Sequence, residues 1–104
     1  MKQEEYGWTT FDDISIYART WRPEGTARAV ISLVHGLGDH TGRYPWLVGT
    51  LTDAGYAISA FDRRGEGKSG GPRVYTPSYE ALLRDIDRHL DNTKERFPQI
   101  PHVL

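Results

Sequence analysis

The sequence of 104 residues predicts an α/β fold in which an antiparallel β-hairpin precedes parallel β-α-β units. Two apolar runs, residues 29–34 and 56–61, have the near-continuous hydrophobicity of strands that are buried in a parallel sheet. A stretch with helical spacing lies between them, and a longer one follows at residues 79–97. This alternation of strands and helices, in a chain of this length, indicates a single domain.

The first expected element is a β-hairpin near an edge of the sheet. Residues 8–11 and 15–21 are rich in β-branched and aromatic side chains, and Asp12 and Asp13 between them are typical turn residues. The sequence RPEG at residues 22–25 then breaks the chain. We therefore expect two short antiparallel strands before the central part of the sheet.

The next expected elements form a β-α-β unit. The run 29–34 is interpreted as a central parallel strand, because a strand that is covered on both faces needs a nearly continuous apolar sequence. Apolar side chains then recur at helical spacing from residue 44 to residue 51, and Gly55 is placed to end that helix. The run 56–61 follows as the second strand of the unit.

A second helix is expected to begin at Thr76 and Pro77, because threonine can cap a helix and proline needs no donor in the first turn. Residues 98–101, PQIP, end this helix, and another buried strand begins at His102. We interpret the chain as the N-terminal part of one longer domain, cut at the start of its fifth strand. The apolar stripe expected to face the core consists of Tyr79, Leu82, Leu83, Ile86, Leu90 and Phe97.

The composition disfavours several classes of function. Thirteen basic and 14 acidic residues give a net charge of -1 without charged runs, which disfavours nucleic acid as a partner. The chain has no cysteine, and its four histidines lack metal-ligand spacing, so we expect no disulfide, metal or cofactor. The acidic N-terminus and short apolar runs predict neither a signal peptide nor a transmembrane segment. We expect a cytoplasmic protein, either free or attached peripherally to a membrane.

The segment FDRRGEGKSGG, residues 61–71, contains part of a phosphate-binding P-loop motif, G-K-S. A P-loop requires glycine where this chain has Asp62, whose carboxylate would repel phosphate. The sequence GGP at residues 70–72 also opposes the helix that must begin there. Nucleotide binding is therefore not predicted at this segment.

The same segment also satisfies the G-x-S-x-G pattern of a serine hydrolase, with Ser69 as the serine. A nucleophile elbow is a sharp turn directly between a strand and a helix, whereas Ser69 follows Phe61 by eight residues. Ser69, Asp85 or Asp91, and His102 occur in the order of a catalytic triad, but such orders arise by chance in a chain rich in aspartate. We therefore do not predict Ser69 to be a nucleophile.

Three segments together resemble the monoacylglycerol lipase and lysophospholipase branch of the α/β-hydrolases. They are VHGLGDHTGRY at residues 34–44, FDRRGEGKSGG at residues 61–71, and FPQIPHVL at residues 97–104. Their order and spacing match over nearly the whole chain. The resemblance implies strands one to four, two helices and the start of strand five of the α/β-hydrolase sheet. It also places the nucleophile elbow, the cap and the remaining triad residues beyond residue 104.

The resemblance assigns an oxyanion role to the loop after the first central strand. In the family, the backbone N–H of the residue matching Leu37 is one oxyanion donor, and the residue after the nucleophile provides the second. His35 is expected to be structural, because the family's catalytic histidine follows the nucleophile in the chain. Gly36 and Gly38 are expected to support the same loop. Residues expected to line the substrate entrance or brace the loop are His40, Arg43 and Tyr44.

The resemblance makes the loop after the second central strand a supporting loop rather than a catalytic one. Asp62 can accept backbone N–H groups of its own turn, and the glycines allow the loop to bend beside the oxyanion loop. Glu66 departs from the family, which usually has histidine at this position. The supporting residues are Asp62, Arg64, Gly65, Gly67 and Ser69.

The resemblance implies hydrolysis of a carboxylic ester, such as a monoacylglycerol or lysophospholipid, by a serine nucleophile through an acyl-enzyme. The 104 residues are expected to be inactive alone and to assemble with the complementary C-terminal segment or with another copy. The alternative is a non-catalytic binding or assembly module derived from a hydrolase fold. A coding sequence that ends at Leu104 would favour the module, and one that continues into an elbow would favour the hydrolase.

Overall fold

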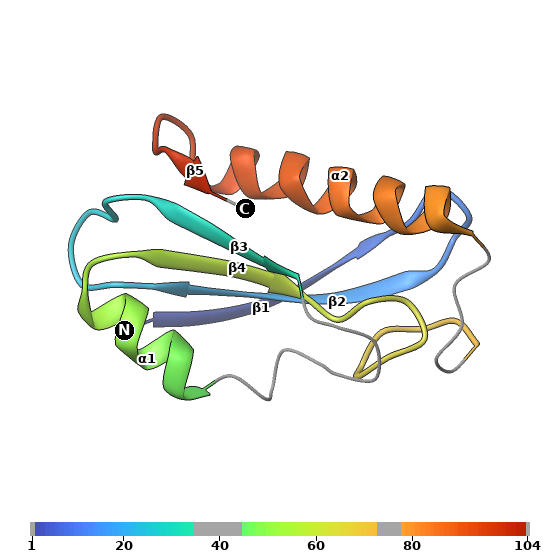
Figure 1. Cartoon of the computed structure of the whole chain (residues 1–104), viewed down its shortest axis with the longest axis horizontal. Coiled ribbons are helices and arrows are strands. Elements are labelled where there is room, and N and C mark those ends of the chain that lie inside the picture. The colour runs from blue at the N-terminus through green and yellow to red at the C-terminus, as the bar shows by residue number, and fades with distance from the viewer. Residues whose placement is uncertain (1, 35–44, 73–77, 104) are drawn as a thin grey trace.

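The structure, a computed structural model, describes residues 2–34, 45–72 and 78–103 (Figure 1). The antiparallel hairpin, the β-α-β unit, the second helix and the start of a fifth strand are all present, which confirms the predicted fold class. In chain order the elements are β1 (Lys2–Thr9), β2 (Ser15–Arg22), β3 (Val30–Val34), α1 (Pro45–Asp53), β4 (Ala57–Phe61), α2 (Tyr79–Arg96) and β5 (His102–Val103).

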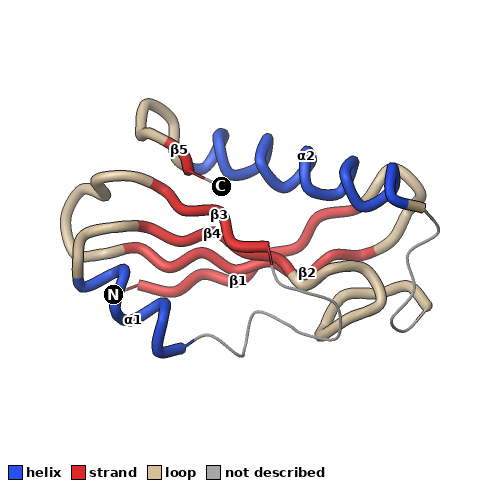
Figure 2. Tube along the Cα trace, in the orientation of Figure 1, coloured by secondary structure: helices blue, strands red, loops and turns tan. Residues whose placement is uncertain are grey.

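The five strands form one mixed sheet in the order β1-β2-β4-β3-β5 (Figure 2). β2 is antiparallel to both β1 and β4, whereas β3 is parallel to both β4 and β5. All five residues of β4 are buried, as expected for a strand with neighbours on both sides and helices on both faces. Because of these strand directions, the β1–β2 turn and the carboxyl ends of β3 and β4 lie at the same end of the strands. We call this end the carboxyl edge of the sheet, which is distinct from the outer strands β1 and β5.

The two helices cover opposite faces of the sheet (Figure 1). Ile58 of β4 packs with Val48 of α1 on one face. The ring of Phe61 lies 4.7 Å from the ring of His89 of α2 on the other face. Successive side chains of a strand point to opposite faces, so β4 contributes to two separate cores. Neither described helix combines the length and apolarity needed to cross a membrane.

β1 begins at Lys2, six residues before the predicted start at Trp8. Its register with β2 runs from Lys2 opposite Arg22 to Thr9 opposite Ser15. Charged residues such as Glu4, which pairs with Arg22 at 2.9 Å, are tolerated because β1 forms an edge of the sheet. The search for apolar runs missed this part of the strand because an exposed edge strand does not need them.

The start of α2 also differs from the prediction. Its N-cap is Ser78, whose Oγ accepts a hydrogen bond from the backbone N–H of Ala81 at 3.0 Å. The predicted start at Thr76 and Pro77 was therefore two residues too early, and those two residues lie outside the described part of the chain.

The buried face of α2 is more polar than the predicted apolar stripe. Tyr79 and Leu83 of that stripe are 73% and 45% exposed, so the stripe as a whole does not face the core. Only Phe97, just after the helix, is fully buried. The half-buried members of the stripe are Leu82, Ile86 and Leu90. The buried residues of the helix recur every four positions and are Ala81, Asp85, His89 and Thr93.

Candidate functional site at the carboxyl edge of the sheet

The predicted functional edge lies where β3 and β4 end. Val34 and Phe61, the last residues of these parallel strands, are direct neighbours in the sheet. Open parallel sheets bind their ligands at this edge, in the loops that follow the strands. The loop after β3 lies outside the described residues, so the roles assigned to it stay predictions. Its predicted site residues are His35, Gly36, Leu37, Gly38, His40, Arg43 and Tyr44.

The loop after β4, residues 62–72, folds back on the hairpin, and we call it the β4 loop. Within the loop, Asp62 Oδ2 accepts a hydrogen bond from the backbone N–H of Lys68 at 2.9 Å. The backbone N–H of Gly70 donates to the carbonyl of Ser15 at 2.7 Å. The loop is therefore closed on itself and attached to the start of β2.

Two glycines give the β4 loop its backbone shape. Gly65 and Gly67 have φ angles of +76° and +53°, a region that residues with a side chain rarely adopt. The N–H of Gly65 donates to the carbonyl of Gly70 at 2.7 Å, which holds the two sides of the loop together. A side chain at either glycine would strain this arrangement.

Ser69 closes the β4 loop through its side chain. Its Oγ donates a hydrogen bond to the carbonyl of Asp62 and accepts one from the backbone N–H of Tyr17 at 2.9 Å. Ser69 is 1% exposed, so the hydroxyl is inaccessible to a substrate. The geometry therefore gives Ser69 a structural role and not that of a nucleophile.

Ser69, Asp85 and His102 do not come together as a triad. The hydroxyl of Ser69 is used within the loop, and the carboxylate of Asp85 pairs with Arg64. His102 Nε2 lies 3.1 Å from the carbonyl of Phe97, at the far end of α2. Their order in the sequence is therefore a coincidence.

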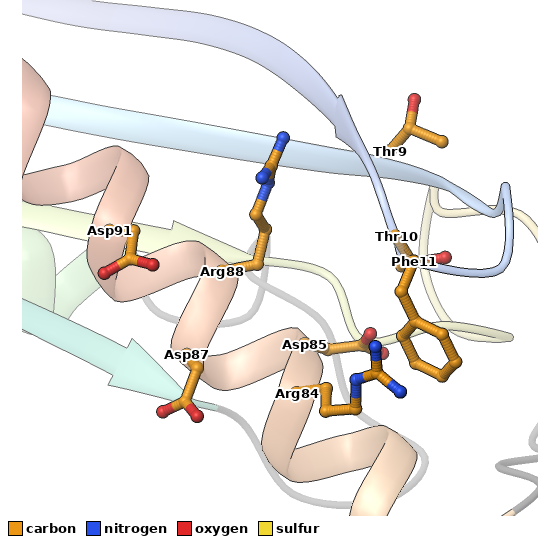
Figure 3. A pocket seen from close by; sticks show the side chains of 8 residues that line it. All are labelled: Thr9, Thr10, Phe11, Arg84, Asp85, Asp87, Arg88 and Asp91. Atoms are coloured by element: carbon orange, nitrogen blue, oxygen red, sulfur yellow. The ribbon is translucent and has the colours of Figure 1, made fainter.

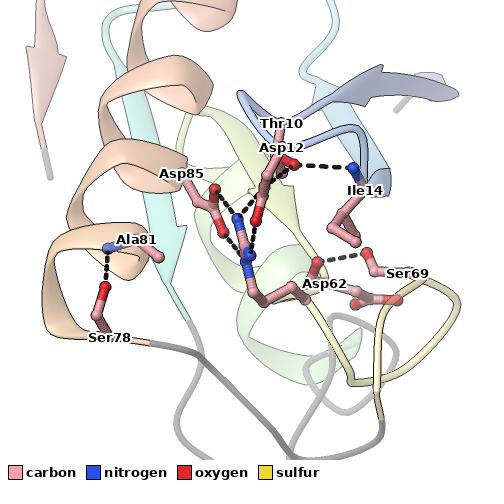
Figure 4. A network of polar contacts seen from close by, with 9 residues as sticks. Thr10, Asp12, Ile14, Asp62, Ser69, Ser78, Ala81 and Asp85 are labelled. Atoms are coloured by element: carbon pink, nitrogen blue, oxygen red, sulfur yellow. Dashed lines mark hydrogen bonds and ion pairs between the residues drawn. The ribbon is translucent and has the colours of Figure 1, made fainter.

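Arg64 is bound by the carboxylates of Asp12 and Asp85, and we call these three residues the Arg64 cluster; the two aspartates are labelled in Figure 4. Asp85 of α2 accepts hydrogen bonds from Nε at 2.7 Å and from Nη2 at 3.0 Å. Asp12 of the β1–β2 turn accepts hydrogen bonds from Nη1 at 2.7 Å and from Nη2 at 2.8 Å. Bidentate pairs of this kind fix orientation as well as adding energy. The cluster thus links the β4 loop, the hairpin and the helix.

The contacts of the Arg64 cluster shift the pKa values of Arg64 and Asp12. The hydrogen bonds that Arg64 donates to Asp85, and then those to Asp12, raise the pKa of Arg64 above its ordinary value. Arg64, followed by Thr10, lowers the pKa of Asp12 well below its usual range. Thr10 contributes because its hydroxyl donates to Asp12 Oδ1 at 2.6 Å. Arg64 and Asp12 therefore both stay ionised at neutral pH.

Sequence analysis named Arg64 but missed the roles of both of its partners. Asp12 was interpreted as a turn residue only, and Asp85 as a chance member of a triad. For Asp85 a signal was present, since it lies four residues after Ala81 and four before His89 on one helical face. A carboxylate in a buried row needs a cation, and the row was hidden by the more hydrophobic stripe beside it.

A second polar cluster lies under α2, formed by His89, Ser59 and Thr93, and we call it the His89 cluster. His89 Nε2 lies 3.3 Å from Ser59 Oγ, which is 2.8 Å from Thr93 Oγ1. Burial lowers the pKa of His89 to about 4, so the ring is neutral at pH 7. The cluster lies in the core between α2 and β4, which gives this histidine a structural role.

A hollow of about 490 Å³ lies between the end of β1 and α2 (Figure 3). The guanidinium of Arg84 covers the ring of Phe11 at 3.7 Å on one side of it. Acidic and basic side chains are mixed in its wall, and its lining among the described residues includes neither serine nor histidine. Its lining consists of Thr9, Thr10, Phe11, Arg84, Asp85, Asp87, Arg88 and Asp91.

Comparison with known proteins identifies the family. Residues 25–104 match the family described as serine aminopeptidase, S33. The chain is 34% identical over 89 residues to the monoglyceride lipase of Mus musculus, which covers 86% of this chain and 29% of the mouse protein.

Solved structures show the same fold. A lipase in its open form superposes with a TM-score of 0.85 at 26% identity, over 97% of this chain and 34% of that one. A soluble variant of the monoglyceride lipase from Saccharomyces cerevisiae, in complex with a substrate analog, gives 0.82 at 23% identity, over 98% and 34%. The chain thus spans about a third of the length of each of these three proteins. It belongs to the α/β-hydrolases, in the serine aminopeptidase S33 family and the monoacylglycerol lipase branch.

Proposed function

We propose that this chain is the front part of a serine hydrolase that cleaves carboxylic esters of the monoacylglycerol or lysophospholipid type. One observation carries the proposal. The sequence HGLG, residues 35–38, directly follows Val34 in the chain, and Val34 ends β3 beside the end of β4. In a chain 34% identical to a monoglyceride lipase, this motif therefore comes next in the sequence after a strand that ends where parallel sheets bind ligands.

In the proposed reaction, a serine beyond residue 104 attacks the ester carbonyl and gives its proton to a histidine. The carbonyl oxygen becomes negatively charged, and the backbone N–H of Leu37 donates a hydrogen bond to it. The alcohol leaves with the proton from the histidine, and an acyl-enzyme remains. Water then attacks the acyl group, releases the acid and restores the serine.

We propose that the β4 loop supports this chemistry without taking part in it. Asp62, Arg64 and Ser69 direct their polar groups to the loop itself, the hairpin and α2. The loop starts at Phe61, beside the residue from which the proposed oxyanion loop departs. A rigid neighbour of this kind favours a fixed position for an oxyanion donor, which must be preorganised to be effective.

We further propose that a complementary C-terminal segment of the same protein supplies the elbow and the remaining triad residues, and that residues 1–104 alone assemble with that segment or with another copy of themselves. β5 has only two residues and lies at an edge of the sheet. Among the described strands β5 has a neighbour on one side, β3, so the backbone groups of its other side can pair with a further strand.

The test uses the product of the complete coding sequence, assayed with a monoacylglycerol and a short-chain aryl ester. Replacing the Leu37 amide by an ester linkage, or Leu37→Pro, removes the proposed donor and should lower kcat by roughly 100- to 1,000-fold. Leu37→Ala keeps the N–H and should keep most of the turnover. Residues 1–104 alone should show no hydrolysis above background.

An unchanged thermal midpoint serves as the folding control for Leu37→Pro. A folded variant without this N–H that retained turnover within a few-fold of the parent would refute the oxyanion assignment. A coding sequence that ends at Leu104, with no ester hydrolysis by its product, would support the binding or assembly module instead.

A further inference from the structure

We propose that Asp12 and Asp85 are positioning residues, which fix the β4 loop at the reactive edge by holding Arg64 from two sides. The inference rests on the proposed function, because that function places the reaction at this edge. Neither aspartate belongs to the segments that follow β3 and β4. Asp12 lies in the β1–β2 turn, and Asp85 is the seventh residue of α2.

The geometry leaves Arg64 a single orientation. Its side chain is 3% exposed, and its guanidinium makes four hydrogen bonds of 2.7–3.0 Å, two to each carboxylate. A lysine at this position has one compact ammonium and cannot make two planar bidentate pairs. The side chain of Asp85 is 1% exposed and that of Asp12 is 36% exposed. Asp85 therefore binds the guanidinium within the core, and Asp12 binds it from the solvent side.

The turn presents Asp12 in a fixed position before it meets Arg64. Thr10 Oγ1 donates to Asp12 Oδ1 and accepts a hydrogen bond from the backbone N–H of Ile14 at 2.9 Å. The backbone N–H of Thr10 donates to the carbonyl of Ile14 at 2.9 Å, which closes the turn. Little side-chain entropy remains to be lost when Asp12 binds the guanidinium.

Arg64 attaches the β4 loop in a different direction from three of its backbone contacts, which lie on the β2 side. The N–H of Asp62 donates to the carbonyl of Tyr17, Ser69 accepts from the N–H of Tyr17, and Gly70 donates to Ser15. All of these contacts join the loop to the start of β2. Arg64 adds the link to α2 and to the turn, and the Gly65 N–H that follows it closes the loop on Gly70. Release of Arg64 should therefore loosen the loop while the sheet stays intact.

The test compares Asp12→Asn with Asp13→Asn in the product of the complete coding sequence. Both variants remove one charge from the same turn, but only Asp12 contacts Arg64. Asp13 has a φ of +66°, a conformation that asparagine tolerates well, so it is a matched control. Amide hydrogen exchange is measured at Gly65, Ser69 and Gly70 and, for comparison, in the β2–β4 ladder.

Asp12→Asn should speed exchange of the three loop amides by about tenfold, as expected for loss of a charge-assisted pair that is partly exposed. The ladder amides should stay within about twofold of the parent. In the ester hydrolysis assay, kcat should fall by about tenfold with little change in KM, because a misplaced donor weakens the transition state more than the ground state. Asp12→Glu should recover part of both effects, and Asp13→Asn should show neither.

Equal loop exchange in the Asp12→Asn and Asp13→Asn variants would overturn the inference. A uniform increase in the exchange rates of the loop amides and the β2–β4 amides would also overturn it, because that result would mean that Asp12 stabilises the whole fold. If the parent protein hydrolyses no ester, the proposed function fails, and the exchange comparison still decides whether Asp12 positions the loop. Loss of kcat with unchanged loop exchange would also contradict the inference.

Discussion

The two polar clusters beneath α2 solve the problem of burying polar groups in different ways. The Arg64 cluster lies toward the N-terminal end of the helix, is built from two ion pairs, and joins three separate elements. The His89 cluster lies further along the helix, is neutral, and joins α2 to β4 alone. Charge is thus used at the edge proposed for function, and neutral hydrogen bonds are used within the core.

The two clusters also differ in how their buried polar groups are compensated for the loss of hydration. In the Arg64 cluster every charged group has a counter-ion at hydrogen-bonding distance, which offsets the loss of hydration. In the His89 cluster, Nδ1 of the buried ring has no hydrogen-bond partner among the described residues. The ring packs against Phe61 in a tilted arrangement and stays uncharged at neutral pH. The charged cluster should therefore be sensitive to loss of a partner, and the neutral one to acid.

The largest effect is expected from Arg64→Met, which breaks the charged cluster. This change leaves the carboxylate of Asp85, 1% exposed, buried without its cation. Loss of one partner of a buried ion pair typically costs about 3–5 kcal/mol of unfolding free energy. Urea unfolding of the complete gene product at pH 7 measures the change.

Arg88→Met is the matched control, because Arg88 lies on the same helix and is exposed. Its stability should stay within about 0.5 kcal/mol of the parent. The double variant Arg64→Met with Asp85→Met should recover most of the loss, since it removes both charges. An Arg64→Met variant as stable as the Arg88→Met variant would show that the cluster contributes no net stability.

A pH titration tests the His89 cluster, because acid protonates the buried ring of His89. The pKa of His89 is about 4 in the folded chain against an ordinary value of 6.5, because burial disfavours the charged ring. Between these values the unfolded chain binds a proton that the folded chain does not, so stability falls as the pH is lowered from 6.5 through 4. The shift corresponds to a loss of about 3 kcal/mol at the acid end.

Urea midpoints between pH 7.5 and pH 4 measure this loss, and His89→Gln should remove most of it in that window. The lowered pKa values of Glu4 and Asp12 cause losses mainly at lower pH, so they do not account for a decline that begins near 6.5. If the parent and the His89→Gln variant lost stability equally from pH 6.5 to pH 4.5, the buried histidine would not be responsible.

The strand and helix order was predictable from sequence because buried parallel strands and an intervening amphipathic helix leave clear periodic patterns. The beginning of β1 was not predictable from sequence, since an edge strand that carries Lys2, Glu4 and Glu5 has no such pattern. The buried face of α2 was missed for a related reason. Hydrophobicity ranks Leu83 above Asp85, whereas the structure buries Asp85 with Arg64 and exposes Leu83.

For the candidate site, sequence predicted a supporting role for Arg64 and Ser69 through a family resemblance, and it identified Asp62 as a turn acceptor. It did not find Asp12 as a partner of Arg64, because the two residues are 52 positions apart in the chain. Such a contact depends on how β2 pairs with β4, which spacing alone does not determine. The residues of the proposed oxyanion loop, centred on Leu37, lie outside the described part of the chain and stay predictions.

Ser69→Ala extends the comparison to the β4 loop and should have the smallest effect. The hydroxyl joins two backbone groups, the carbonyl of Asp62 and the N–H of Tyr17, and alanine leaves both without this partner. Loss of a buried neutral hydrogen-bonding group costs about 1–2 kcal/mol, less than loss of a charged partner. Ser15→Ala is the control, because Ser15 is exposed and contributes its backbone carbonyl to the loop.

The same variant separates a loop-closing serine from a nucleophile. Removal of a catalytic serine lowers kcat by roughly 10⁶-fold, whereas a loosened supporting loop should lower it by no more than about tenfold. Urea unfolding and ester hydrolysis by the complete gene product therefore give independent answers. A Ser69→Ala variant with parental stability and no measurable turnover would contradict the geometry, in which this hydroxyl is buried and already bonded on both sides.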